Sequence, residues 1–370
     1  MGKIHHSFIT KNLENLIIDI LKSEKKKDIH ISPFNRFGHS GSNLYLLSFS
    51  KEKNVGVSYL LKTFDNKKKL EREISATKQL EDKYCHINLK LVESKGPLYG
   101  FLMQNFSANP SDENSTITFK DIMYNNKYNV SKIINMTFEK NGLGLGDVYK
   151  QTEIKKCQVS KYYSKYLRND ETRKIIQSLT KDSIKNIKID FLGKKITNPF
   201  YVKEQLLKEV INMPISLIHG DLHPDNIVIN HLKHPRIVDF AWSNKNDIYI
   251  DFALFEMSVR YWNPLFYMNC QQKESLERKT LDKNFSCSDI DIDVNDEYTN
   301  KIKKMVVIIQ EIRKICQNIV GDKYNFYNHL LSQFIVLYGM LKYETYNPYI
   351  VIPFLSMLGD KLIKMEYMKQ

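Results

Sequence analysis

A single polar loop and the hairpin after it constrain this chain more than any other stretch. Residues 218–229 read Ile-His-Gly-Asp-Leu-His-Pro-Asp-Asn-Ile-Val-Ile, and residues 236–241 read Arg-Ile-Val-Asp-Phe-Ala. The pattern predicts a loop rich in carboxylates and imidazoles, an apolar strand, a turn and a second apolar strand that ends on an Asp. Asn226 and Asp239 are therefore expected at neighbouring ends of a hairpin, close enough to share one divalent cation. Ligands that offer only oxygen suit Mg²⁺, which keeps several waters and binds substrate phosphates.

The His-Gly-Asp-Leu-His-Pro-Asp-Asn stretch followed by Val-Asp-Phe resembles the catalytic and metal loops of the aminoglycoside phosphotransferase and choline kinase-like family, which are small-molecule relatives of protein kinases. Its spacing also fits the protein-kinase template, an Asp base followed five positions later by a metal-binding Asn and further on by a metal-binding Asp. The resemblance implies that Asp221 accepts the proton of the substrate hydroxyl and that His219 braces the loop. It also implies that Asn226 and Asp239 bind Mg²⁺. Ala241 departs from protein kinases, which carry Gly there.

Length and cysteine usage bound the class of protein. The chain has 370 residues with 42% hydrophobic content, enough for a large core and two lobes of one catalytic unit. Its five cysteines are scattered, which argues against a disulfide framework and against a zinc site. The first residues lack the apolar core of a signal peptide, and the most apolar stretch, residues 334–341, is too short to span a bilayer. We expect a soluble, cytoplasmic protein with no membrane partner.

The formal charge of +13 could attract nucleic acid, anionic lipid or phosphorylated ligands. Lys is spread through the chain, however, and its two runs of three, at residues 25–27 and 67–69, are not interleaved with aromatic side chains. The sequence therefore argues against nucleic acid as a partner. It says nothing of the oligomeric state.

The N-terminal part alternates between helical and extended patterns. Residues 11–22 place five aliphatic side chains on one helical face. Residues 37–47 read as a strand, a turn of small residues and a second strand, with Ser40, Gly41 and Ser42 in the turn. Small residues let backbone N–H groups approach phosphates, so these three are candidate nucleotide contacts. Any hairpin turn could carry the same residues.

Lys62 lies among apolar residues in the predicted strand 57–64. A buried Lys needs a charged partner, and the next helix, residues 67–83, offers Glu71 and Glu73. Glu73 shares a helical face with Leu70, which favours it as the partner. The pair resembles the strand Lys and helix Glu of kinases, with the Lys reaching the nucleotide phosphates. The alternative is a Lys on an edge strand that faces water.

Two further strands, residues 87–92 and 98–106, complete a predicted antiparallel sheet with one helix. In a kinase-like fold, residues 103–106, including Gln104 and Phe106, form the hinge that binds the nucleotide base. We therefore predict an α+β, protein kinase-like fold of two lobes. Residues 1–106 form the small N-lobe with its antiparallel sheet, and residues 107–370 form a larger, mostly helical C-lobe.

The predicted C-lobe is helical over most of its length. Residues 142–147 are expected to form a flexible turn, residues 151–215 two or three helices, and residues 271–300 an acidic loop or insertion. Three helices are expected near residues 298–319, 324–343 and 348–366. Asp251 opens an apolar helix and could cap it. The family resemblance implies instead that Asp251 supports the catalytic loop by accepting its backbone N–H groups.

Together these residues predict a phosphotransferase that moves the γ-phosphate of Mg²⁺-bound ATP or GTP to a hydroxyl of a small molecule. Each role has a candidate in the expected chain order, and the identity of the acceptor stays open. A non-catalytic, kinase-shaped nucleotide-binding module is the first alternative. A metal-dependent hydrolase that uses His219, Asp221, His223 and Asp225 is a second, and a protein kinase a third.

Overall fold

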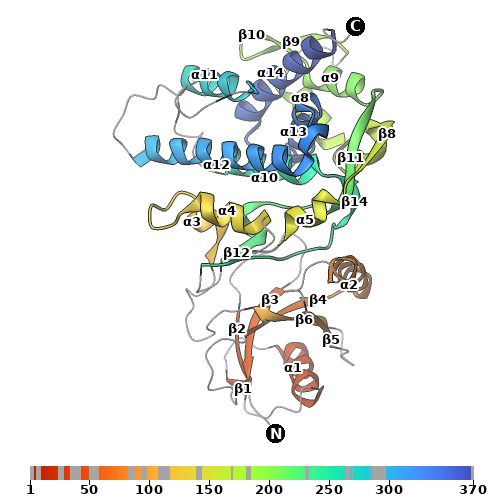
Figure 1. Cartoon of the computed structure of the whole chain (residues 1–370), viewed down its shortest axis with the longest axis vertical. Coiled ribbons are helices and arrows are strands. Elements are labelled where there is room, and N and C mark those ends of the chain that lie inside the picture. Colours follow the sequence, from red (N-terminus) through yellow and green to blue (C-terminus); the bar gives the residue numbers. More distant parts are fainter. Residues whose placement is uncertain are drawn as a thin grey trace. The chain divides into compact units, whose positions relative to one another are not determined.

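The structure is a computed structural model that describes residues 4–5, 10–23, 29–33, 43–49, 58–81, 88–92, 98–106, 117–138, 144–167, 170–180, 185–229, 233–262, 268, 270–283, 285 and 297–367. It divides into two compact units. Unit 1 comprises Met1–Ile122, Met136–Leu145 and Asp225–Asn244, and unit 2 comprises Met123–Asn135, Gly146–Pro224 and Lys245–Gln370. The hairpin with Asn226 and Asp239 thus belongs to the same unit as the N-terminal sheet. Figure 1 labels the helices and strands.

Unit 1 is built on a six-stranded sheet with strand order β1-β2-β3-β4-β6-β5. The strands are β1 (Ile4–His5), β2 (Ile29–Pro33), β3 (Asn43–Phe49), β4 (Ser58–Phe64), β5 (Asn88–Val92) and β6 (Tyr99–Phe106). The predicted antiparallel sheet is confirmed from β2 onward, but β1 pairs with β2 in parallel. A helix between these two strands returns the chain to the same end of the sheet, which is what a parallel pair requires.

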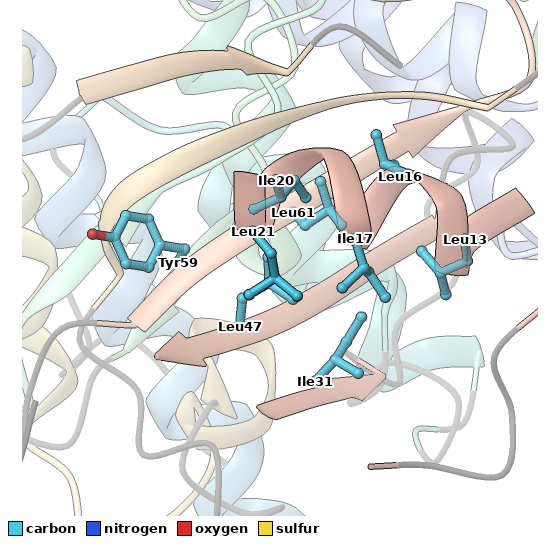
Figure 2. Packing of buried hydrophobic residues seen from close by; sticks show 9 residues of the cluster. All are labelled: Leu13, Leu16, Ile17, Ile20, Leu21, Ile31, Leu47, Tyr59 and Leu61. Carbon is cyan, nitrogen blue, oxygen red and sulfur yellow. The ribbon is translucent and has the colours of Figure 1, made fainter. Parts of the chain in front are cut away.

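That helix, α1 (Lys11–Ser23), covers one face of the sheet. The five aliphatic side chains of its predicted apolar face recur at helical spacing and are all buried. They pack against side chains from β2, β3 and β4 to form the cluster in Figure 2, which comprises Leu13, Leu16, Ile17, Ile20, Leu21, Ile31, Leu47, Tyr59 and Leu61.

The other face of the sheet meets α2 (Lys67–Glu81), which contacts β4, β5 and β6. Successive residues of a strand point to opposite faces, so Leu61 joins the α1 cluster while its neighbour Lys62 points toward α2. β4 lies inside the sheet between β3 and β6, which excludes the alternative of an exposed edge-strand Lys. The strand alternation therefore separates an apolar face from a charged one.

A second, three-stranded sheet of unit 1 carries the hairpin that is flanked by Asn226 and Asp239, in the order β13-β12-β7. Its strands are β7 (Ile117–Thr118), β12 (Ile227–Ile229) and β13 (Pro235–Ile237), and α3 (Phe119–Ile122) follows β7. Asp225, just before the hairpin, accepts hydrogen bonds from Thr118 Oγ1 at 3.3 Å and Lys120 Nζ at 3.1 Å. The start of the hairpin is thus held by charged and polar groups of its own unit.

Unit 2 is mainly helical, but residues 151–215 do not form the two or three helices that the sequence suggested. They contain the strands β8 (Glu153–Gln158), β9 (Lys188–Phe191), β10 (Lys194–Thr197) and β11 (Val210–Ile218), and the helices α6 (Val159–Tyr162), α7 (Ser164–Leu167), α8 (Asp170–Leu179) and α9 (Pro199–Leu206). β11 pairs with β8 from Val210↔Gln158 onward and joins β14 (Asn244–Asp247) in a three-stranded sheet. Because each partner strand lies far away in sequence, local periodicity does not reveal the pairing.

The rest of unit 2 agrees better with the sequence. The three predicted C-terminal helices are confirmed as α12 (Glu297–Val320), α13 (Phe326–Met340) and α14 (Pro348–Tyr367). Further helices are α4 (Val130–Phe138), α5 (Leu145–Lys150), α10 (Tyr249–Tyr261) and α11 (Cys270–Thr280). The prediction of a loop over residues 271–300 is wrong for α11, and the acidic residues 289–296 lie outside the described residues. The turn predicted over residues 142–147 is wrong from Leu145 onward, where α5 begins; Gly144 before it has φ +70°, and residues 142–143 also lie outside the described residues.

These elements confirm the predicted α+β, protein kinase-like fold class, with a unit built on a small sheet and a larger, mostly helical unit. Within the described ranges, no helix is both long and apolar enough to cross a membrane.

Candidate active site

Lys62 is the centre of a buried ionic cluster in unit 1. Its Nζ lies 2.6 Å from Glu73 Oε1 and 3.0 Å from Asp239 Oδ1, and Lys62 and Glu73 are only 4% and 2% exposed. Glu71, the other possible partner, forms an exposed pair with Lys67 instead. Lys62 on β4 thus links the carboxylate of Glu73 on α2 to that of Asp239, which follows the β12–β13 hairpin.

The charges of this cluster do not balance, because one ammonium group serves two carboxylates. Burial would lower the pKa of Lys62, but Asp239 and Glu73 outweigh it and raise that pKa above its ordinary value. Burial raises the pKa of Glu73 to about 7. The positive charge of Lys62 opposes this rise, and the negative charge of Asp239 adds to it. A further cation beside these carboxylates would complete the balance.

The hairpin brings Asn226 and Asp239 to neighbouring positions, as its strand pattern predicts. Ile227 pairs with Ile237, and Val238 N donates a hydrogen bond to Asn226 O at 3.0 Å. Asp239 comes directly after Val238 and therefore lies next to Asn226. Asp239 has φ +66°, a left-handed conformation that Asp tolerates better than most residues and that is common at functional sites.

These two residues fit a hard divalent cation. A carboxamide oxygen and a carboxylate oxygen are ligands that Mg²⁺ accepts, and two protein ligands leave room for waters and phosphate oxygens. The residues of the hydrolase alternative do not complete a nitrogen- or sulfur-rich shell, since no three His, Cys, Asp or Glu side chains gather as a metal site in the described part of the chain. The donor set at the hairpin therefore favours Mg²⁺ over zinc.

The loop before the hairpin is held by Asp251 within unit 2. Asp251 Oδ2 accepts from His219 N at 2.7 Å and from the Tyr149 hydroxyl, and Oδ1 accepts from Gly220 N at 2.8 Å. Burial raises the pKa of Asp251, and the charge of His219 and these hydrogen bonds oppose the rise. Asp251 lies in the first turn of α10 and does not cap it; Asp247 accepts from Tyr249 N at 3.0 Å instead.

Asp221 directly follows this supported segment. His219 Nδ1 accepts from Asp221 N at 3.3 Å, which places His219 as a brace of the loop, and His223 Nε2 lies 3.7 Å from Asp221 Oδ2. Burial alone would raise the pKa of Asp221, but the hydrogen bond and charge of His223, followed by the charges of Lys165 and His219, hold it below its ordinary value. Asp221 is thus an ionised carboxylate, as a proton acceptor must be.

The remaining predicted nucleotide contacts are only partly described. Ser40, Gly41 and Ser42 lie outside the described residues. Gln104 and Phe106 lie on β6, where Gln104 pairs with Asn88 and Phe106 with Ser58. The structure therefore gives the strand positions of Gln104 and Phe106, whereas the turn with Ser40, Gly41 and Ser42 stays a prediction.

Several contacts around these residues were not expected from the sequence. The Arg72 guanidinium lies 3.8 Å from the centre of the Trp242 ring, so a residue next to Glu73 stacks on a residue close after Asp239. Trp262 packs edge-on against His223, with ring centroids 5.2 Å apart. One sign of these aromatic contacts was present in the sequence: the chain has only two tryptophans in 370 residues, and both lie near the motif.

Residues 186–268 match the model of the phosphotransferase enzyme family APH. This segment contains Asp221, Asn226, Asp239 and Asp251, so the match confirms the family resemblance over the part of the chain that carries those residues. Lys62 and Glu73 lie outside it. A comparison with curated protein sequences found no match.

Similar solved structures include the choline kinase LicA from Streptococcus pneumoniae, with 14% identity, 90% of this chain and 99% of that chain covered, and a TM-score of 0.39. A choline kinase from Cryptosporidium parvum Iowa II has 12% identity, coverage of 96% and 95%, and a TM-score of 0.43. The ADP-bound aminoglycoside phosphotransferase APH(2'')-Ib has 14% identity, coverage of 95% and 98%, and a TM-score of 0.44. Each similarity spans most of both chains at low identity.

Proposed function

We propose that the protein is a small-molecule kinase that transfers the γ-phosphoryl group of Mg²⁺-bound ATP or GTP to a hydroxyl of a small acceptor. The observation that carries this proposal is the position of Lys62 between Glu73 and Asp239, at 2.6 and 3.0 Å. A buried Lys in contact with a helix Glu and with a hairpin Asp is the arrangement that phosphoryl transfer uses to hold nucleotide phosphates. The family match over residues 186–268 supports the same reaction class.

In the proposed reaction, unit 1 binds the donor. Lys62 contacts the phosphates and stays cationic because two carboxylates surround it. Asn226 and Asp239 would hold Mg²⁺, which when bound neutralises phosphate charge and orients the β- and γ-phosphates. The turn with Ser40, Gly41 and Ser42 and the strand with Gln104 and Phe106 are proposed contacts to the phosphates and the base. On this view residues 1–106 form the N-lobe with the phosphate loop and the strand Lys, and residues 107–370 form the helical C-lobe with the catalytic and metal-binding loops.

Asp221 of unit 2 is the proposed base. The acceptor oxygen forms a bond to the γ-phosphorus while the bond from that phosphorus to the β–γ bridging oxygen breaks. The hydroxyl proton passes to Asp221, and the bridging oxygen leaves with its electron pair on the nucleoside diphosphate. Asp251 and His219 keep the loop in place, so Asp221 needs little rearrangement during the step. We place this reaction in the cytoplasm, which supplies ATP and keeps cysteines reduced.

Nucleotide binding is the first test. We expect Mg-ATP or Mg-GTP at about 100 times its Kd to stabilise the fold by ~2.7 kcal/mol, seen as a rise in the thermal unfolding midpoint. The rise should require Mg²⁺ and should be lost in Asp239→Asn. If neither nucleotide moves the midpoint of the wild-type protein, the proposal fails.

Transfer is tested by release of ADP or GDP with a panel of alcohols that includes amino alcohols and aminocyclitols. Asp221→Asn should bind nucleotide like the wild type but transfer at least about a hundredfold more slowly, since general base catalysis contributes 10²–10⁴-fold. A protein that binds Mg-nucleotide with no turnover on any acceptor or on water would instead be the non-catalytic module.

A further inference from the structure

Gly220, the residue in front of Asp221, is held through both its backbone N–H and its backbone carbonyl, and only the contact to the N–H was expected. Gly220 N donates to Asp251 Oδ1 at 2.8 Å, while Gly220 O accepts from Lys165 Nζ at 3.0 Å. Gly220 has φ +77°, a backbone conformation that favours glycine. The carbonyl that Lys165 holds belongs to the peptide bond that joins Gly220 to Asp221. A shift of this cation would therefore move the backbone of Asp221 directly.

Lys165 reaches the loop because the short helix α7 packs unusually close to α13. A Cβ built on Gly339 of α13 would lie 2.7 Å from Tyr166 Cβ, 2.8 Å from Tyr166 O and 2.9 Å from Tyr166 Cα. Atoms do not approach so closely, and two of these three belong to the backbone, so only glycine permits the contact. Tyr166 is buried, whereas Lys165 is an exposed residue whose ammonium group turns toward Gly220.

The groups that face Asp221 are mostly cationic or neutral. His223 lies 3.7 Å away, His219 accepts its backbone N–H, and Lys165 is bonded to the preceding carbonyl. The phenols of Tyr166 and Tyr346 also interact with Asp221, and Asp251 accepts the N–H of Gly220, the residue before Asp221. The charge of Lys165 favours the carboxylate form of Asp221 and so lowers its pKa, in addition to the effect of the two imidazoles.

We propose that Lys165 is a positioning residue for the phosphoryl transfer, which fixes the Gly220 carbonyl and thereby orients Asp221 toward the acceptor hydroxyl. This inference rests on the proposed function of Asp221 as the base. Gly339 serves the same purpose indirectly, because it sets the distance of α7 from α13. Nothing in the family-like motif assigns a role to either residue, since both lie outside residues 218–241.

Lys165→Met, Lys165→Arg and the control Lys161→Met test the role of the cation. Lys161 is also exposed, lies on the adjoining helix α6 and contacts the Tyr162 ring at 5.8 Å. The readout is ADP release from Mg-ATP across pH, with water or the best alcohol of the panel as acceptor. We expect Lys165→Met to lower kcat about tenfold with KM for ATP within about twofold, because the loop loses the charged donor that fixes the Gly220 carbonyl; tenfold corresponds to about 1.4 kcal/mol in the barrier.

The acid limb of kcat/KM should also move to higher pH in Lys165→Met, because the pKa of Asp221 loses a lowering charge. Lys165→Arg should restore most of both effects, and Lys161→Met should match the wild type. An unchanged kcat and acid limb in Lys165→Met overturns the proposal, and so does an equal loss in Lys161→Met. A wild-type protein with no turnover of ATP would contradict the proposed function itself, which is a separate result.

Gly339→Ala supplies an independent test that keeps the Lys in the chain. It should lower kcat and move the acid limb in the same direction as Lys165→Met. Gly359→Ala on α14 is the matched control, because its Cβ would meet mainly the Val202 side chain, at 2.8 Å from Cγ2. If Gly339→Ala loses stability yet keeps the wild-type kcat and pH profile in its folded fraction, the position of α7 does not matter to Asp221.

Discussion

Two buried ionic clusters, one in each unit, differ in how their charges are balanced. In unit 1, Lys62 is the one cation that faces the carboxylates of Glu73 and Asp239 among the described residues, and the Asp239 side chain is 22% exposed. In unit 2, two arginines face two glutamates, and all four residues are buried. Within the part of the chain that the structure describes, the first cluster has one cation for two carboxylates and the second has two cations for two carboxylates.

The cluster of unit 2 centres on Glu256, which joins three helices. Glu256 Oε1 accepts from Arg260 Nη2 and from Arg313 Nη2, each at 2.7 Å, and Oε2 accepts from Gln333 Nε2 at 2.7 Å. Arg260 also binds Glu277 Oε2 at 2.7 Å, which adds α11. Burial would raise the pKa of Glu256, but Arg313 and Arg260 hold it well below its ordinary value. Every charge has its counter-charge inside the protein, which is the mark of a structural cluster.

The comparison teaches that burial of charges does not by itself mark a functional site. Both clusters contain ionised residues with shifted pKa values. What separates them is that one is complete and the other is short of positive charge. An incomplete, partly exposed cluster can bind a cation that supplies the missing charge, such as a divalent metal ion.

Breaking the balanced cluster should give the largest effect on stability. Glu256→Gln removes the counter-charge of both arginines, and loss of one partner from a buried ion pair costs about 3–5 kcal/mol. Chemical denaturation should show this loss in the free energy of unfolding. Glu274→Gln is the control, because its pair with Arg278 at 2.8 Å is exposed and worth about 0–1 kcal/mol. Equal losses in the two variants would refute the comparison.

Breaking the unbalanced cluster should affect binding more than folding. Lys62→Met should abolish most of the ~2.7 kcal/mol by which Mg-nucleotide at 100 times its Kd stabilises the wild type. Its loss of stability without ligand should be smaller than that of Glu256→Gln, because Glu73, with a pKa of about 7, can take up a proton. Lys67→Met, which loses only an exposed pair with Glu71, should keep the full ligand effect. Unfolding midpoints with and without Mg-nucleotide decide between these outcomes.

A third buried carboxylate sharpens the comparison, because the groups of the described residues that bond to it are neutral donors. Asp247 accepts from the Tyr163 hydroxyl at 2.8 Å and from Tyr249 N at 3.0 Å, and burial raises its pKa from 3.8 to about 7. Between these pH values the folded protein binds more protons than the unfolded chain. Its contribution to stability should therefore fall as pH rises from about 4 to about 7, by up to ~1.4 kcal/mol per pH unit.

Asp247→Asn should flatten this part of the stability–pH curve, since Asn cannot ionise and the Tyr163 hydroxyl can turn to accept from its amide. Denaturation of both proteins at several pH values provides the measurement. A variant with the same slope as the wild type would show that Asp247 is ionised throughout, despite its burial.

The smallest effect is expected at the edge of the unit 1 cluster. Arg72→Met removes the cation from the Trp242 ring, and an exposed cation–π contact is worth about 0.5–1 kcal/mol. Trp242→Leu should lose the same contribution to the free energy of unfolding, because it removes the same contact. A double-mutant cycle of the two substitutions should therefore give a coupling free energy of about 0.5–1 kcal/mol. A coupling near zero would mean that the stacked geometry contributes nothing to holding α2 beside the hairpin.

Much of the fold could be predicted where the signal is local. The helical face of α1, the strands β4 to β6 and the three last helices follow from periodicity over 5 to 20 residues. The strands β8 and β11 could not be found this way. Lys-rich β8 has an alternating pattern that also suits a solvated helix, and its pairing with β11 depends on residues more than 50 positions away.

The same division holds inside the candidate site. Asp221, Asn226 and Asp239 lie within one short motif, so their spacing alone predicts a shared hairpin and a hard metal ion. Lys62 and Glu73 were identifiable because a Lys in an apolar strand needs a partner, and the next helix has a carboxylate on its inner face. Arg72, Trp242 and Lys165 gave no such signal, because exposed basic and aromatic residues occur throughout this chain.

The sequence by itself determined the order of the chemical groups: a strand Lys, a helix Glu, a loop Asp, a hairpin Asn and a hairpin Asp, each in a locally favoured element. Only the tertiary structure decided which charges are balanced, that Glu256 is closed in by two arginines, and that Gly339 lets α7 bring Lys165 to Gly220. The reason is physical. Element type depends on neighbours within a few turns, whereas charge balance and close packing depend on atoms that folding brings together from distant parts of the chain.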